Sequence, residues 1–232
     1  MSRRRVSNPL ALAVLCCLIE GPKHPYEIST TLRTRGKEQS IKLNYGSLYS
    51  VVESLQKHGL IRPRETVREG RRPERTVYEI TDAGITECED WLAELLSTPV
   101  REFTSLEAGL SLMPTLRPSE VLELLELRAE RLRIERRSIE AAHAEGEAIH
   151  LPELFMVESR YRRAMLDAEL QFVTALAVSI KDGTLQGLSG WYRVHELRDE
   201  GVTLEEMMAD PLRYFGEEGR LLLREFNNSN AD

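Results

Sequence analysis

Apolar residues recur at helical spacing through the first third of the chain and predict three short helices. The first starts at the capping sequence Ser7-Asn8-Pro9 and stops before Gly21-Pro22, and the second runs from about Pro25 to Gly36. The third lies within Leu43–Leu60, with Gly59 at the expected C-terminal cap. Four residues of this third helix share one face at i, i+3, i+4, i+7 spacing: Leu48, Val51, Val52 and Leu55.

The pattern then changes to the alternation of apolar and polar residues that is typical of strands. Leu60–Val67 and Arg75–Thr81 alternate in this way, and the segment between them, Arg68–Glu74, contains glycine and proline. These features predict a β-hairpin with a long, basic tip. Three short helices followed by a hairpin is the element order of a winged helix-turn-helix. Thr81-Asp82 then caps a fourth predicted helix that ends near Ser97.

After a linker at residues 97–101 the remaining pattern is helical throughout. A short helix is predicted over about 106–113, a long one over about 118–144, and another over 152–180, with a break around Gly146. The two long helices carry apolar stripes that they cannot bury alone, so we expect them to pack on each other and on a second subunit. The residues expected to support dimerisation are Leu125, Leu132 and Ile139 on the first long helix and Met165 and Phe172 on the second.

The predicted fold is therefore mainly α, in the α+β class, with an N-terminal winged helix-turn-helix and a C-terminal dimerisation domain of long helices. We expect three regions. Residues 1–98 form the DNA-binding domain, residues 99–181 form a helical dimerisation and effector domain, and residues 182–232 are a C-terminal extension of unassigned role. The last region shows weaker helical periodicity than the others.

Charge is distributed unevenly along the 232 residues and supports a nucleic-acid partner. Residues 1–81 hold 15 Lys and Arg against 8 Asp and Glu, a balance of +7, whereas the rest holds 16 against 30, a balance of −14. Together they give the net charge of −7. A basic N-terminal third on an acidic chain is typical of a DNA-binding domain joined to an acidic partner domain.

Candidate DNA contacts gather on the polar side of the third helix and on the hairpin. The second helix of a helix-turn-helix motif enters the major groove, and its first turns face the base edges. The candidates at and just before these turns are Lys42, Asn44, Tyr45, Ser47, Tyr49 and Ser50, and those on the wing are Arg71, Arg72 and Arg75, with Arg62, Arg64 and Arg68 on its first half. Two alternatives to DNA contact stay open. Tyr49 packs into the core, and half of the wing arginines are simply solvated.

Other chemistries find little support in the sequence. The chain has no P-loop, GxGxxG, GxSxG or HExxH pattern, so we expect neither an enzyme nor a cofactor. The five histidines are scattered, and we expect no metal site. The adjacent Cys16 and Cys17 are either small core residues or a redox pair. Trp91, Trp191 and Tyr192 are candidates for lining an effector pocket, although Trp91 falls on the apolar face of its helix.

No apolar run is long enough to span a membrane. The most apolar segment, residues 9–19, follows three arginines as a signal peptide would, but no small-residue cleavage site comes after it. We therefore expect a cytoplasmic, nucleoid-associated protein with no membrane partner.

Specific motifs resemble the PadR family of transcriptional regulators. They are Asn44-Tyr-Gly-Ser-Leu-Tyr49, Gly59-Leu-Ile61 and Tyr78-Glu-Ile-Thr-Asp-Ala-Gly84, which are similar to the family's YG(S/T)LY helix, its apolar turn into the wing and its exit from the wing. Gly21-Pro-Lys-His-Pro-Tyr-Glu-Ile28 is similar to the segment leading into the family's second helix. The wing departs from the family's pattern at Glu74 and Thr76.

The resemblance implies a homodimeric repressor that binds double-stranded DNA at an inverted-repeat operator. It places Tyr45, Ser47 and Tyr49 where family members contact bases and phosphates, and it leaves room for a small-molecule effector that releases the operator. The alternative is a winged-helix protein-interaction adaptor that has lost DNA binding. The retained basic wing argues against that alternative.

Overall fold

The computed structural model describes residues 6, 8–41, 43–67 and 75–216, and at residues 45, 66, 67 and 75 it describes the backbone only. The chain divides into two compact units, residues 1–102 and 103–232. The fold is mainly α, as predicted, and the sheet within the described residues has two strands. Among the helices described, none is both long and apolar enough to cross a membrane.

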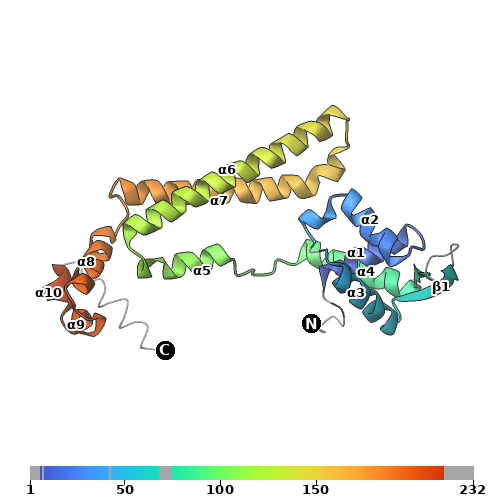
Figure 1. The fold of residues 1–232 in the computed structure, drawn as a ribbon, viewed down its shortest axis with the longest axis horizontal. Helices are drawn as coiled ribbons and strands as arrows, with labels where there is room; N and C mark the ends of the chain where they lie inside the picture. Colours follow the sequence, from blue (N-terminus) through green and yellow to red (C-terminus); the bar gives the residue numbers. More distant parts are fainter. Residues whose placement is uncertain (1–5, 7, 42, 68–74, 217–232) are drawn as a thin grey trace. The chain divides into compact units, whose positions relative to one another are not determined.

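The first unit has the element order of a winged helix-turn-helix (Figure 1). In chain order it contains α1 (Pro9–Ile19), α2 (Pro25–Thr34), the 3-10 helix η1 (Lys37–Gln39), α3 (Tyr45–Lys57), β1 (Ile61–Val67), β2 (Arg75–Ile80) and α4 (Asp82–Ser97). The predicted helices and hairpin are confirmed, with ends that shift by one to three residues.

Helix α1 is the centre of this unit. Asn8 caps it by accepting a 3.0 Å hydrogen bond at Oδ1 from the backbone N–H of Leu10, and Pro9 occupies its first turn. Every residue from Leu10 to Leu18 except Cys16 is buried, which is far more than the single apolar face that its periodicity predicts. The reason is that α1 packs on α2, α3, α4 and β2 at once, so a helix with almost no polar residues is stable there.

The hairpin is antiparallel, with Ile61 opposite Ile80 and Arg62 opposite Glu79. Its register shifts between Pro63 and Glu65, as at a β-bulge. The segment after α1 adds a short bridge on the other side of β2, where Lys23 and Tyr78 exchange two backbone hydrogen bonds of 3.1 Å. These bonds attach the wing to the helical part of the unit.

The junction between β2 and α4 depends on Thr81 and Gly84. The Thr81 hydroxyl contacts the carbonyl oxygens of Gly59 and Leu60 and accepts the N–H of Gly84, so it caps α4 and holds the turn after α3. A Cβ added at Gly84 would lie 2.1 Å from the carbonyl oxygen of Leu60. Only glycine fits this close approach, which gives a structural reason for the Tyr78–Gly84 motif.

The second unit is helical throughout the part described. It contains α5 (Ser105–Leu112), the 3-10 helix η2 (Met113–Thr115), α6 (Pro118–Ala148), the 3-10 helix η3 (Glu153–Met156), α7 (Val157–Lys181), α8 (Leu188–Asp199), α9 (Leu204–Ala209) and α10 (Pro211–Phe215). Figure 1 shows α6 and α7 as a long antiparallel hairpin, with α8–α10 gathered near its open end.

The predicted helix break lies a few residues later than Gly146, because α6 continues through this residue to Ala148. Gly146 is buried in the last turn, where an added Cβ would lie 3.1 Å from the sulfur of Met156, so its small size serves packing. The chain leaves the helix at His150, two residues after Ala148, and His150 adopts a left-handed φ of 54°. The N–H of His150 donates to Glu147 O at 3.0 Å and that of Leu151 to Gly146 O at 2.9 Å, the pattern of a Schellman C-cap.

The interface between α6 and α7 uses only part of the expected apolar surface. Its core contains Val121, Leu125 and Ala129 from α6, Val173, Ala177 and Ile180 from α7, and Leu188 from α8. Most of the apolar stripe predicted for α7 lies on a different face and is exposed in the single chain. Its exposed members include Leu154, just before α7, and Val157, Tyr161, Met165 and Phe172.

Helix α8 packs on the turn before α6 and on the start of α6. Trp191 Nε1 donates to Leu116 O at 2.9 Å, and His195 Nε2 lies 3.1 Å from Pro114 O. Arg117 donates a 2.6 Å hydrogen bond to Asp199, which lowers the pKa of that carboxyl. Through these contacts α8 holds the turn between α5 and α6.

Candidate nucleic-acid interface

Helix α3 has a buried apolar face and an exposed polar face. Leu48, Val51, Val52 and Leu55 are buried in the core of the first unit, as predicted. Asn44 caps the helix by accepting the N–H of Gly46 at Oδ1, over 2.9 Å. This bond leaves the Asn44 side-chain amide N–H groups available at the exposed start of the helix.

The polar face of the first turns remains accessible. Asn44 and Ser50 are exposed, Ser47 is half-buried, and Tyr49 keeps 48% of its surface exposed, so its ring does not lie in the core. The Ser50 hydroxyl donates to Gly46 O at 3.1 Å and can still accept a hydrogen bond. Tyr45 begins the helix, and its side chain lies outside the described residues.

The first strand of the wing carries two arginines that share one acid. Arg62 Nε donates to Glu79 Oε1 at 2.7 Å, and Arg64 lies 3.9 Å from the other oxygen of the same carboxylate. Sequence reasoning missed this role of Glu79, although the cross-strand pairing of positions 62 and 79 follows once the hairpin register is known. The strand therefore offers DNA less positive charge than its arginines suggest.

Several candidate residues lie outside the part of the chain that the structure describes. These are Lys42, Arg68, Arg71 and Arg72, and Arg75 is described only as the first backbone position of β2. Their proposed contacts remain predictions from the sequence. The structure does place the two ends of the wing, at Val67 and Arg75, in an antiparallel pair.

Helix α2, which precedes α3 in the motif, begins with a cap that sequence reasoning did not identify. His24 Nδ1 accepts the N–H of Tyr26 at 3.1 Å, and Glu27 accepts the N–H of His24 at 2.7 Å. The signal was present in the sequence, because Glu27 stands three residues after the cap and Pro25 directly follows it. This arrangement fixes the start of α2.

The expected dimerisation residues of the second unit occupy two environments. Leu125 and Ile139 are buried within the chain itself, and Leu132 is half-buried. Met165 and Phe172 keep 55% and 51% of their surfaces exposed. The exposed pair is therefore the part of this set that is free to meet another molecule.

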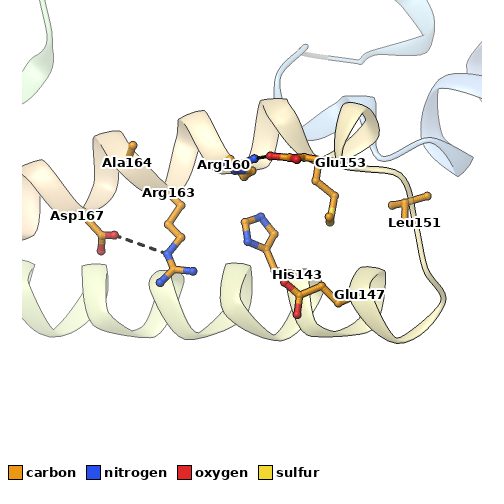
Figure 2. Close-up of a pocket in the computed structure, with 9 residues that line it drawn as sticks. His143, Glu147, Leu151, Glu153, Arg160, Arg163, Ala164 and Asp167 are labelled. Carbon is orange, nitrogen blue, oxygen red and sulfur yellow. Dashed lines mark ion pairs between the residues drawn. The ribbon is translucent and has the colours of Figure 1, made fainter.

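A cavity of about 630 Å³ lies at the closed end of the α6–α7 hairpin (Figure 2). His143 projects from α6 into the space between the two helices, and Arg163 extends into the same space from α7. Arg163 is paired with Glu140 at 3.1 Å and with Asp167 at 3.6 Å, and Arg160 is paired with Glu153. The cavity thus presents arginines whose charges are already balanced by acids.

His143 also ties the two helices together. Its Nε2 lies 2.7 Å from the Ser159 hydroxyl, which itself donates to Met156 O at 2.9 Å. Because a hydroxyl has one hydrogen to donate, His143 Nε2 must carry the proton in this arrangement.

A second cavity, also of about 630 Å³, is an apolar groove along α5 and α6. It is lined mainly by leucines, among them Leu106, Leu110, Leu124, Leu125 and Leu132. A smaller cavity of about 410 Å³ shares Leu106 and Leu132 with it and extends to Met165 and Phe172. The groove therefore continues toward the exposed stripe of α7.

The remaining candidate residues lie in different environments. Trp91 is buried in the core of the first unit, and Trp191 packs on the core of the second, while Tyr192 is 42% exposed. Cys16 and Cys17 both lie on α1, where Cys17 is buried in the first core and Cys16 lies next to Cys88 of α4. Within the described residues no cluster of three or more His, Cys, Asp or Glu side chains could hold a metal ion.

Comparisons with known proteins agree with the fold. The structure is similar to Bacillus subtilis PadR in complex with operator DNA, with 17% identity, a TM-score of 0.61, and coverage of 75% of this chain and 99% of that chain. It is also similar to Bacillus subtilis PadR in complex with p-coumaric acid (16% identity, TM-score 0.58, coverage 76% and 99%). The PadR-like transcriptional regulator BC1756 from Bacillus cereus follows at 14% identity, a TM-score of 0.53 and coverage of 75% and 99%.

No curated protein matches the chain in a sequence search. At these identities the structural likenesses show the fold, and about a quarter of this chain has no counterpart in the PadR chains. The model of the Transcriptional regulator PadR-like family matches residues 14–90, which contain α2, α3, the wing and most of α1 and α4. The winged-helix unit of this chain is therefore similar to the PadR-like family of transcriptional regulators, and the chain carries a long helical C-terminal region beyond the matched residues.

Proposed function

We propose that this protein is a transcriptional repressor that binds a roughly palindromic operator as a homodimer and leaves it when a small-molecule effector binds. The observation that carries the proposal is the exposed polar face of α3 on a helix whose apolar face is fully buried. That face begins at the capping residue Asn44 and includes Tyr49, on a unit that matches the PadR-like family. The function is binding, and no step of it is catalytic.

The first turns of α3 would enter the major groove, where Asn44, Tyr45, Ser47, Tyr49 and Ser50 would contact bases and phosphates. The absence of a Cβ at Gly46 would let the backbone come close to the DNA. Electrostatic attraction to the DNA phosphates would come from Lys42 and from the wing tip. In the sequence, Arg71, Arg72 and Arg75 lie in or next to this tip. Because Glu79 already binds Arg62 and Arg64, we assign the tip the larger share of the phosphate contacts.

A second copy of the chain would cover the exposed stripe of α7. Met165 and Phe172 would contact the partner directly, and Leu125, Leu132 and Ile139 would support the helix pair from inside. In such a dimer, recognition helices one turn of DNA apart, about 34 Å, would reach successive major grooves. The two-fold symmetry of a homodimer is the reason for proposing a palindromic operator.

The effector proposal rests on the cavities of the helical unit. Bacillus subtilis PadR has been solved with p-coumaric acid, and we propose a small organic effector for this chain as well. The cavity around His143 is our candidate site, because it has an apolar side at Leu151 and several polar side chains. Binding there would have to favour one arrangement of the two winged units over another in order to release DNA.

For the organisation of the chain we propose residues 1–98 as the DNA-binding domain and residues 99–181 as the dimerisation and effector domain. Residues 182–232 form the extension, whose helix α8 we assign the task of holding the α5–α6 turn through Trp191 and Asp199. The protein would act in the cytoplasm on nucleoid DNA.

The alternative is an adaptor that uses the winged unit to bind another protein. The two functions are distinguished by selecting bound fragments from the organism's own genome and measuring their affinity at several salt concentrations. A repressor enriches a common palindromic sequence, and the logarithm of its binding constant falls linearly with the logarithm of salt concentration. An adaptor enriches no sequence.

The Arg72→Ala variant tests the wing within the same experiment. Loss of one phosphate contact should lower the salt slope by about one while leaving sequence preference intact. Arg137→Ala, which removes an exposed arginine of α6 in the helical unit, is the matched control and should leave the slope unchanged. An unchanged slope in Arg72→Ala would remove the wing from the proposed interface.

A further inference from the structure

Two cysteines that are far apart in the sequence meet in the core of the winged unit. Cys16 of α1 and Cys88 of α4 are separated by 72 positions, and their Sγ atoms lie 3.5 Å apart. Cys88 is fully buried, whereas Cys16 is partly exposed, so only one sulfur of the pair is open to solvent. DNA binding by α3 and the wing uses neither of them.

The two sulfurs are close enough to form a bond after a modest movement. A disulfide bond is about 2.05 Å long, so the atoms would have to approach each other by roughly 1.5 Å. Closing the bond therefore requires rotation of the two side chains or a small shift of α4 relative to α1. Cys17, although adjacent to Cys16, points into the core with 2% of its surface exposed, and a ring closed between neighbouring residues would distort α1.

The environment gives the two thiols different roles. Burial, reinforced by the hydrogen bond with Cys16, raises the pKa of Cys88 to about 12, so this thiol stays protonated at neutral pH. Cys16 is the partly exposed member of the pair, and it is the one that a dissolved oxidant can reach. This difference in exposure makes Cys16 the cysteine that is oxidised first and Cys88 the resolving cysteine beside it.

We propose that Cys16 and Cys88 form an oxidation site for hydrogen peroxide that closes to an intramolecular disulfide. The Cys16 thiolate attacks one peroxide oxygen, the O–O bond breaks, and the departing hydroxide takes a proton to become water, leaving a sulfenic acid on Cys16. Cys88 sulfur then attacks Cys16 sulfur, the S–O bond breaks, and the Cys88 proton leaves with the hydroxyl as a second water. The two thiols lose two electrons and the peroxide gains them.

The bond would covalently join α1 and α4, two parts of the winged unit that pack on each other. Helix α4 begins directly after β2, the second strand of the wing, and α1 packs on α3. A covalent link between α1 and α4 therefore connects the support of α3 to the end of the wing. Trp91 lies one turn after Cys88 in the same core and would sense the change.

The test treats the reduced full-length protein with hydrogen peroxide, unfolds it in an alkylating reagent, and counts the thiols by mass spectrometry. The chain has three cysteines, so the expected result is a fall from three alkylated thiols to one, with a cross-link between the peptides that contain Cys16 and Cys88. Treatment with dithiothreitol should restore all three. Monomer mass on a non-reducing gel should be unchanged, because the bond lies within one chain.

Matched variants identify the sulfurs, since Cys16 and Cys17 fall in one proteolytic peptide. Cys17→Ser should still lose two thiols, whereas Cys16→Ser should lose none to a disulfide and should fold, because position 16 is partly exposed. Cys88→Ala removes the buried sulfur instead and should likewise form no disulfide. Three thiols remaining after peroxide, a bond to Cys17, a bond between chains, or overoxidation of Cys16 without a cross-link would each overturn the proposal.

Discussion

Helices α3 and α7 are both amphipathic, but folding leaves opposite faces of them uncovered. In α3 the apolar residues are buried in the unit's own core and the polar side remains accessible, including the half-exposed ring of Tyr49. In α7 one apolar face is buried on α6, and a second apolar face with Met165 and Phe172 remains exposed. Two helices with the same periodicity thus expose different surfaces. The exposed surface is polar on α3 and apolar on α7.

The difference indicates what each surface binds. An exposed polar face costs nothing in water and gains energy only from a polar or charged partner such as DNA. An exposed apolar stripe is unfavourable in water and is typical of a protein–protein interface. We therefore propose that α3 contacts DNA and that α7 contacts a second copy of the chain. Separate substitutions test the two proposals.

The largest expected effect comes from placing a charge in the α7 stripe. Phe172→Asp should raise the dimer dissociation constant by about 30- to 1,000-fold, because truncated interface anchors cost about 2–4 kcal/mol. Sedimentation velocity at several concentrations measures the change. Leu212→Asp, at a similarly exposed apolar position on α10, is the control and should leave the dimer intact. A monomeric wild type, or a dimer that tolerates Phe172→Asp, would contradict the assignment.

The packing beneath the DNA-binding face is tested by Gly84→Ala. The added methyl group would meet the carbonyl oxygen of Leu60 in the turn between α3 and β1, so we expect a loss of about 1–3 kcal/mol in unfolding free energy. Chemical denaturation followed by circular dichroism measures it. Gly109→Ala in α5 has open space around its Cβ and should stabilise the chain slightly, by at most about 1 kcal/mol. Equal effects of the two substitutions would show that the close approach at Gly84 is unimportant.

The polar face of α3 is tested by Tyr49→Ala. Loss of its contact should weaken operator binding by roughly tenfold, or about 1.4 kcal/mol, without changing the dimer. Fluorescence anisotropy on a labelled duplex gives the affinity. Tyr192→Ala removes a tyrosine of comparable exposure from the helical unit and should bind normally. If both variants bind like wild type, Tyr49 does not contact DNA.

The smallest effect is expected at the end of α6, where His150 occupies a left-handed conformation. Glycine adopts this conformation without steric cost, so His150→Gly should raise the unfolding free energy by about 0.5–1 kcal/mol. Thermal unfolding reports the change. His150→Val, a β-branched residue at the same φ, should lower the stability, and no difference between the two substitutions would contradict the role of this cap.

The sequence predicted the winged unit well because each of its signals is local. Asn8 and Thr81 are recognisable caps, Gly59 ends α3 in a left-handed conformation, and the alternation of apolar and polar residues marks the two strands of the hairpin. All of these features depend on residues within a few positions of one another. The main omission was Glu79, whose pairing with two arginines required the cross-strand register.

The helical unit was predicted less well because its decisive signals are tertiary. Gly146 suggested a break, but the contact with Met156 makes it a packing residue, and the helix ends at His150, which no propensity identifies. The face of α7 that packs on α6 could not be separated by periodicity from the face that stays exposed. Only the exposed fractions of Met165 and Phe172 make that distinction.

The most direct test of the whole account compares the affinity of the wild-type protein for a genomic fragment that it selects with its affinity for a shuffled duplex of equal length and composition. The account predicts a preference of at least about 1,000-fold at physiological salt, two chains bound per duplex, and a linear fall of log K with log salt for both duplexes. Equal affinity for the two duplexes, or binding that does not change with salt, would contradict it.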